Sequence, residues 1–137
     1  MNASGADAGA GDATAVPSIA SLRQGAVPFV LASDLGLVIE VNEAFQQAYG
    51  WTSAELAGQS LSVILPGSFR MAHQLGFSRF KATGRSEILA HPLRLATICR
   101  DGREVVSEHF IVAERLADAW VFGATLTPLP EGTARDA

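Results

Sequence analysis

The chain has 137 residues, of which 48% are hydrophobic and 18% are charged, and its formal net charge at pH 7 is −4. This length suits one domain with one core. The acidic balance argues against a nucleic-acid-binding domain, which usually presents a basic surface. Its single cysteine, Cys99, excludes an internal disulfide framework and a multi-cysteine zinc site, and it indicates a reducing compartment. Because no apolar run is long enough to cross a bilayer, we expect a cytoplasmic protein without a membrane span.

Both ends of the chain differ in composition from its middle. Residues 1–25 are rich in Ala and Gly and predict a flexible N-terminal segment, although residues 18–22 suit a short helical turn that packs on the domain. Prolines at positions 128 and 130 cannot continue a strand easily, so residues 128–137 predict a flexible C-terminal tail. The expected folded domain is residues 26–127.

The first elements of this domain are a hairpin and a helix. Residues 28–32 and 37–41 are apolar and β-prone, and the turn-forming residues 33–36 lie between them, so the sequence predicts a β-hairpin. Asn42 is a good N-cap for a helix over residues 43–49.

A second short helix is predicted directly afterwards. Gly50 ends the first helix. Thr52 and Glu55 have the spacing of a capping box, and Gly58 closes the short helix that they begin. Residues 61–65 form an apolar stretch before a proline.

The rest of the domain is predicted to contain one long helix and three strands. Residues 67–82 are the longest helical candidate, and residues 89–100 and 103–114 flank the strong hairpin signal Asp101–Gly102. Residues 119–127 supply the last strand. The predicted fold class is therefore α+β, a five-stranded antiparallel sheet with helices on one face. The core residues that we predict are Phe45, Trp51, Leu56 and Phe77.

Three short motifs carry a resemblance to a known family. They are Val38–Phe45 (VIEVNEAF), Tyr49–Gly58 (YGWTSAELAG) and Arg100–Glu104 (RDGRE). In this order, over residues 26–127, they resemble a PAS domain, a small α+β module for sensing and interaction. The resemblance implies the PAS fold, whose sheet and helices enclose a pocket that holds haem, flavin, a small metabolite or nothing.

This resemblance predicts a sensory or adaptor domain in signal transduction that binds an unidentified small ligand and acts by protein–protein association. No kinase or cyclase follows residues 125–128, so we expect its output to pass to a signalling partner in trans. The sequence lacks a Ser-His-Asp order, a P-loop and a dinucleotide fingerprint, so we expect no enzyme. A small-molecule enzyme on a PAS-like scaffold is a further alternative, which ranks below the sensory domain and below the haem sensor described next.

The predicted helix over residues 67–82 contains a histidine among apolar neighbours. The residues on that side of the helix are Phe69, His73, Gly76, Phe77 and Phe80. This helix resembles the haem-ligating helix of oxygen-sensing PAS domains, in which the matching histidine binds iron. The resemblance implies His73 as the axial metal ligand of a haem, with Arg94 near the strand position of a ligand-responsive arginine. The alternative is that His73 is a packed, hydrogen-bonded core residue. The identity of the cofactor therefore stays unknown, with haem as one possibility.

The strand predicted over residues 103–114 has two alternating sets of side chains. One set is Val105, Ser107, His109 and Ile111, and the apolar members of the other are Val106, Phe110 and Val112. If the first set faces the pocket, His109 is a polar pocket wall; otherwise it is a partly exposed residue at a strand edge. The second set then forms an apolar outer face that needs a cover. Either the N-terminal segment covers it through Ile19 and Leu22, or a homodimer does, and we predict the homodimer.

Overall fold

The computed structural model describes residues 17–66, 92–116 and 118–136 of the chain. The elements of these ranges, in chain order, are α1 (Ile19–Gln24), β2 (Phe29–Ser33), β3 (Val38–Val41), α2 (Glu43–Tyr49), α3 (Ser53–Leu56), the 3-10 helix η1 (Leu61–Ile64), β4 (Leu93–Ile98), β5 (Glu104–Leu116) and β6 (Ala119–Pro128). The helix predicted over residues 67–82 lies outside the described residues.

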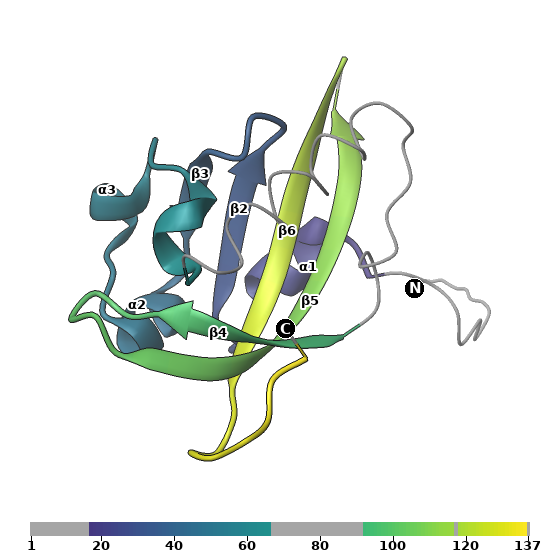
Figure 1. Ribbon diagram of the computed structural model, residues 1–137. Coiled ribbons are helices and arrows are strands. Elements are labelled where there is room, and N and C mark those ends of the chain that lie inside the picture. The colour runs from purple at the N-terminus through teal and green to yellow at the C-terminus, as the bar shows by residue number, and fades with distance from the viewer. Residues whose placement is uncertain (1–16, 67–91, 117, 137) are drawn as a thin grey trace.

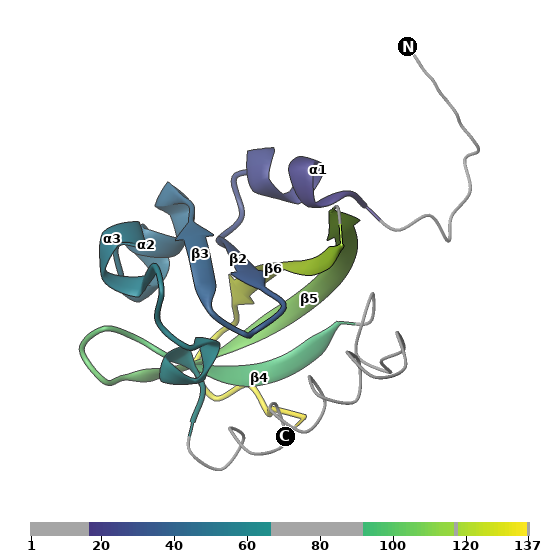
Figure 2. The ribbon, with the colours of Figure 1, turned by 90° about the horizontal axis from the view of Figure 1, so that it is seen from above.

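The five strands form one antiparallel sheet in the order β3-β2-β6-β5-β4 (Figure 1). Its longest pairing joins β5 and β6, from Ser107 opposite Pro128 to Leu116 opposite Ala119. Helices α2, α3 and η1 lie over one face of the sheet, which we call the inner face, and α1 lies over the opposite, outer face (Figure 2). The predicted α+β class and the five-stranded antiparallel sheet are confirmed, while α1 adds a helix on the second face.

Local side-chain chemistry fixes the corner between β3 and the helices. The Asn42 Oδ1 atom accepts hydrogen bonds from the backbone N–H groups of Phe45 and Phe29, both at 2.9 Å. One residue therefore caps α2 and ties it to β2, as the preference of Asn for N-caps predicts. Gly50 ends α2 with a φ of 84°, a left-handed conformation that glycine adopts without steric cost. The capping box of Thr52 and Glu55 is also present.

The inner face and its helices enclose the main core. Phe45 and Leu56 are fully buried in it, as predicted. Trp51 is only partly buried, because its ring lies at the edge of the core, where the indole N–H donates to the carbonyl oxygen of Ile98 at 3.0 Å. The remaining predicted core residue, Phe77, lies outside the described residues.

The outer face carries a second, smaller core under α1. Ile19 packs there with Phe29, Leu31 and Val112, and the half-buried members include Leu22 and Phe110. The Ile19 backbone N–H donates to the Glu114 carboxylate on β5 at 2.7 Å, which anchors the start of α1. At Phe110 and Val112 the outer face is therefore covered by the N-terminal segment, one of the two covers that the alternation of β5 allows.

The C-terminal segment, residues 129–136, returns from the end of β6 toward β4 (Figure 1). The Leu129 N–H donates to the Val106 carbonyl oxygen at 2.9 Å, and the Asp136 N–H donates to the Arg94 carbonyl oxygen at 2.7 Å. Parts of both terminal regions predicted as flexible thus make defined contacts with the sheet. The division of the chain at residues 25 and 128 stays a prediction.

Candidate functional site

Four polar side chains lie buried on the otherwise apolar inner face of the sheet. We call them the polar cluster: Tyr49, Thr97, Ser107 and His109, with exposed fractions of 1%, 0%, 0% and 5%. Burying a polar group costs free energy unless it finds a hydrogen-bond partner, so such a group in a core needs an explanation. This cluster is the strongest candidate for a functional site among the described residues.

Strand register brings three members of the polar cluster together. Leu95 on β4 lies opposite Ser107 on β5, and the neighbouring pairs place Thr97 and His109 on the same face. Tyr49 comes from the last turn of α2, directly before Gly50 ends that helix. Its side chain thus reaches from the helix layer down to the sheet.

Hydrogen bonds join the polar cluster in pairs. The Tyr49 Oη and Ser107 Oγ atoms lie 2.6 Å apart, and the Tyr49 hydroxyl also lies 3.3 Å from the Leu126 carbonyl oxygen. The Thr97 Oγ1 and His109 Nε2 atoms lie 3.1 Å apart, with the donor set by the imidazole tautomer. The Ser107 hydroxyl also donates to a backbone carbonyl oxygen of its own strand at 3.4 Å, so the polar cluster is hydrogen-bonded within the core.

Burial controls the ionisation of Tyr49. Desolvation is the largest influence and raises the pKa of its phenol to about 12, although the hydrogen bond with Ser107 favours the ionised form. At neutral pH the phenol is therefore protonated. It acts as a neutral hydrogen-bonding group and not as a base.

We expect the Tyr49 phenol to titrate with a midpoint near pH 12 in the folded protein. Tyr49 is the only tyrosine of the chain, so absorbance at about 295 nm reports this group alone. Its pKa is raised by folding, so its contribution to stability is complete below the unfolded value of about 10 and disappears as the pH rises to about 12. A midpoint near 10, with native circular dichroism retained, would show that the phenol is not buried.

The predicted site residues separate into three groups. His109 is buried on the inner face and not exposed at a strand edge, while its role toward a ligand stays a prediction. Arg94 lies opposite Glu108, one position out of phase with the pair Leu93 and His109, so its side chain points to the outer face. Arg94 and His109 therefore lie on opposite faces of the sheet, and the role of Arg94 toward a ligand stays a prediction. Five residues lie outside the described ranges: Phe69, His73, Gly76, Phe77 and Phe80.

Sequence reasoning did not assign Tyr49 and Thr97 to the site. Thr97 shares the phase of Leu93 and Leu95 along β4, which is the signal that aligns it with Ser107 and His109. No such signal exists for Tyr49, because its contact with Ser107 spans 58 positions. Cys99 is a buried thiol whose pKa is raised by desolvation, in keeping with a packing role. The part of the chain that the structure describes holds no group of three or more His, Cys, Asp and Glu side chains suited to a metal ion.

Comparison with known proteins shows the fold. No family model matches the chain. An uncharacterized protein of Azorhizobium caulinodans is 28% identical over 98 residues, which is 67% of this chain but only 13% of that protein. The PAS domain of a Desulfitobacterium hafniense protein superposes with a TM-score of 0.63 at 16% identity, covering 79% of this chain and 97% of that chain.

Two further PAS domains show the same likeness. The PAS domain of an HTR-like protein from Haloarcula marismortui has a TM-score of 0.64 at 19% identity, covering 81% of this chain and 88% of that chain. The PAS domain of a Cronobacter turicensis quorum-sensing receptor, in complex with C12:0, has a TM-score of 0.59 at 12% identity, covering 78% and 97%. The chain therefore has the PAS fold. Within the described ranges, no helix is both long and apolar enough to cross a membrane.

Proposed function

We propose that this chain is a PAS sensory module that binds a small ligand at the polar cluster and acts through protein–protein association. The observation that carries the proposal is the set of buried hydroxyl and imidazole groups on the inner face. Solved neighbours support it: one is complexed with C12:0, and another belongs to a two-component sensor histidine kinase.

The composition of the inner face favours a small organic ligand. Binding sites for such ligands are mostly apolar and contain a few polar groups that fix orientation. Here Val30, Leu126 and Phe45 supply apolar surface, and the hydroxyls of Thr97 and Ser107 supply the polar groups. A core built only for stability gains nothing from replacing apolar side chains with hydroxyls at these depths.

We infer a binding role and not a catalytic one. Ser107 is hydrogen-bonded to the phenol of Tyr49, whose raised pKa keeps it protonated at neutral pH, so the phenol is not available to take a proton from Ser107. The proposal includes a cytoplasmic location and a signalling partner in trans. The matched relative is much longer than this chain, so the identity of that partner is not carried over from it.

Native mass spectrometry of protein purified from its own host tests the proposal. We expect the wild-type chain to retain a small-molecule adduct, and Ser107→Ala to retain it with an affinity lower by about 2- to 10-fold, as the loss of one hydrogen bond predicts. Leu35→Ala is the control, because Leu35 is 67% exposed. Equal retention by all three proteins, or no adduct on wild type, would count against the polar cluster as the binding site.

The absorbance spectrum of the same preparation distinguishes haem, bound through His73, from any other small ligand. A Soret band that is lost in His73→Ala would assign the ligand as haem with His73 on the iron. An adduct without a Soret band would assign a different small molecule. In both cases the response of the adduct to Ser107→Ala shows whether the polar cluster contacts it.

A further inference from the structure

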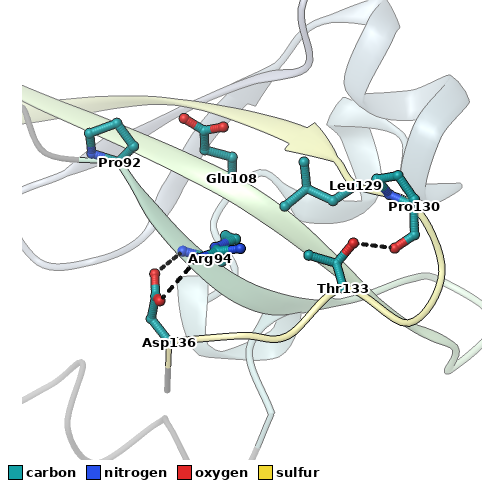
Figure 3. Close-up of a pocket in the computed structure, with 7 residues that line it drawn as sticks. All are labelled: Pro92, Arg94, Glu108, Leu129, Pro130, Thr133 and Asp136. Carbon is teal, nitrogen blue, oxygen red and sulfur yellow. Dashed lines mark hydrogen bonds and ion pairs between the residues drawn. The ribbon is translucent and has the colours of Figure 1, made fainter.

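The C-terminal segment, residues 129–136, crosses the outer face of β4 and β5 and encloses a hollow of about 370 Å³ against them (Figure 3). Its apolar walls are Pro92, Leu129 and Pro130, and its polar groups are Arg94, Glu108, Thr133 and Asp136. This volume lies at the lower end of the range for small-ligand sites, about 300–1,000 Å³. The hollow lies on the opposite face of the sheet from the polar cluster, so it is a second, separate candidate site.

Two opposite charges in the hollow face each other across the strands without pairing. Arg94 on β4 lies directly opposite Glu108 on β5, an arrangement in which opposite charges usually attract each other. The Arg94 guanidinium instead lies 3.9 Å from Asp136 Oδ1. Two backbone contacts fix Asp136 there: its N–H donates to the Arg94 carbonyl oxygen at 2.7 Å, and its Oδ2 accepts from the Arg94 N–H at 2.8 Å. Within the described ranges Glu108 therefore has no ion-pair partner.

The polar groups of the hollow keep hydrogen-bonding capacity for a ligand. The Arg94–Asp136 contact is the longest of the five ion pairs in the described part of the chain, and a guanidinium has five N–H donors. The Thr133 hydroxyl donates to the Pro130 carbonyl oxygen, so its oxygen still accepts. The hollow thus offers donors at Arg94, acceptors at Glu108 and Thr133, and an apolar wall.

This combination matches a small zwitterion with an apolar body. A carboxylate fits the planar N–H donors of Arg94, and an ammonium fits the acceptors of Glu108 and Thr133. An aliphatic side chain fits the wall of proline and leucine side chains. A ligand with a single charge would lie beside one strand charge that repels it, so the pair of unmatched charges selects a ligand that carries both signs.

We propose that the hollow binds a free α-amino acid with an aliphatic side chain, such as leucine, with its carboxylate at Arg94 and its ammonium at Glu108. The site goes beyond the proposed function, because it does not use the polar cluster. The two sites share one strand, since Glu108 lies between Ser107 and His109 along β5.

An NMR titration of the isotope-labelled full-length protein with L-leucine tests the proposal. We expect chemical-shift changes at the backbone amides of Arg94, Glu108 and Thr133. Isopentylamine, which lacks the carboxylate, and isocaproate, which lacks the ammonium, should each bind at least about 5-fold more weakly, as the loss of one exposed ion pair predicts.

Two substitutions assign the charges of the ligand. Glu108→Gln should weaken leucine binding at least about 5-fold. Glu43→Gln is the matched control, because Glu43 is an exposed carboxylate on α2, over the opposite face of the sheet. Arg94→Gln should lower the affinity for leucine to that for isopentylamine, without weakening the binding of isopentylamine.

Four results would overturn the proposal: no chemical-shift change with leucine, equal leucine binding by wild type and Glu108→Gln, equal binding of the three ligands, or changes confined to Thr97, Ser107 and His109. The last result would place leucine at the polar cluster and support the proposed function. Leucine binding at the hollow should be unchanged in Ser107→Ala, so the two proposals fail independently.

Discussion

Phe45→Ala should lower the free energy of unfolding by about 3–5 kcal/mol, the range for truncating a buried aromatic side chain. Phe45 has no exposed surface, and its ring centroid lies 4.9 Å from that of Tyr49. Truncation therefore removes apolar contacts and leaves a cavity beside the polar cluster. Because domains of this size have marginal stability, the loss is a large fraction of the whole. Urea denaturation followed by circular dichroism measures it.

Leu35→Ala provides the comparison for Phe45→Ala. Leu35 lies in the turn between β2 and β3 and is 67% exposed, so its truncation should change stability by no more than about 0.5 kcal/mol. An effect of similar size for the two variants would show that Phe45 is not the centre of the inner core.

Gly123→Ala should destabilise the protein by about 1–3 kcal/mol, because a methyl group at this position overpacks the outer core. An added Cβ atom would lie 3.0 Å from Ile19 Cγ1 and 3.1 Å from Phe29 Cε1, closer than ordinary contact. The expected response is displacement of α1 from β6. Faster hydrogen exchange in residues 19–24, with α2 unaffected, is the measurement that checks it.

A matched glycine and a second substitution test this explanation. At Gly25 an added Cβ atom would lie 3.6 Å from its nearest neighbour, the Leu22 carbonyl oxygen, so Gly25→Ala should be tolerated. If crowding by Ile19 is the cause, Gly123→Ala should cost less in an Ile19→Ala background. If the losses of stability from Gly123→Ala and Ile19→Ala are additive in the double variant, crowding by Ile19 is not the cause.

Local sequence signals predicted much of the described fold. Asn42, Gly50 and the capping box of Thr52 and Glu55 act through neighbours a few positions away, so their roles follow from spacing alone. The hairpin at Asp101–Gly102 was predicted for the same reason, and Gly102 has the positive φ that such turns require. Alternation along β5 correctly separated Ser107 and His109 from Phe110 and Val112.

The candidate site was less accessible to sequence reasoning, because contacts between distant segments create it. The pairing of Tyr49 with Ser107 depends on where α2 crosses the sheet. The side chain of Arg94 points to the outer face, which follows from the register of β4 and not from its place near a family position. Asp136 and Arg94 are hydrogen-bonded although 42 positions separate them in the sequence, and no periodic pattern predicts such a contact.

The most direct test of ligand binding on the inner face is an NMR comparison of two samples of this protein. One sample is purified from its own host, and the other is refolded after extraction of small molecules. We predict chemical-shift changes at the side chains of Thr97, Ser107 and His109, which point inward. The exposed side chains of Leu35 and Ile39, which lie outside the polar cluster, serve as built-in references. Changes confined to the outer face, or identical spectra, would contradict the account.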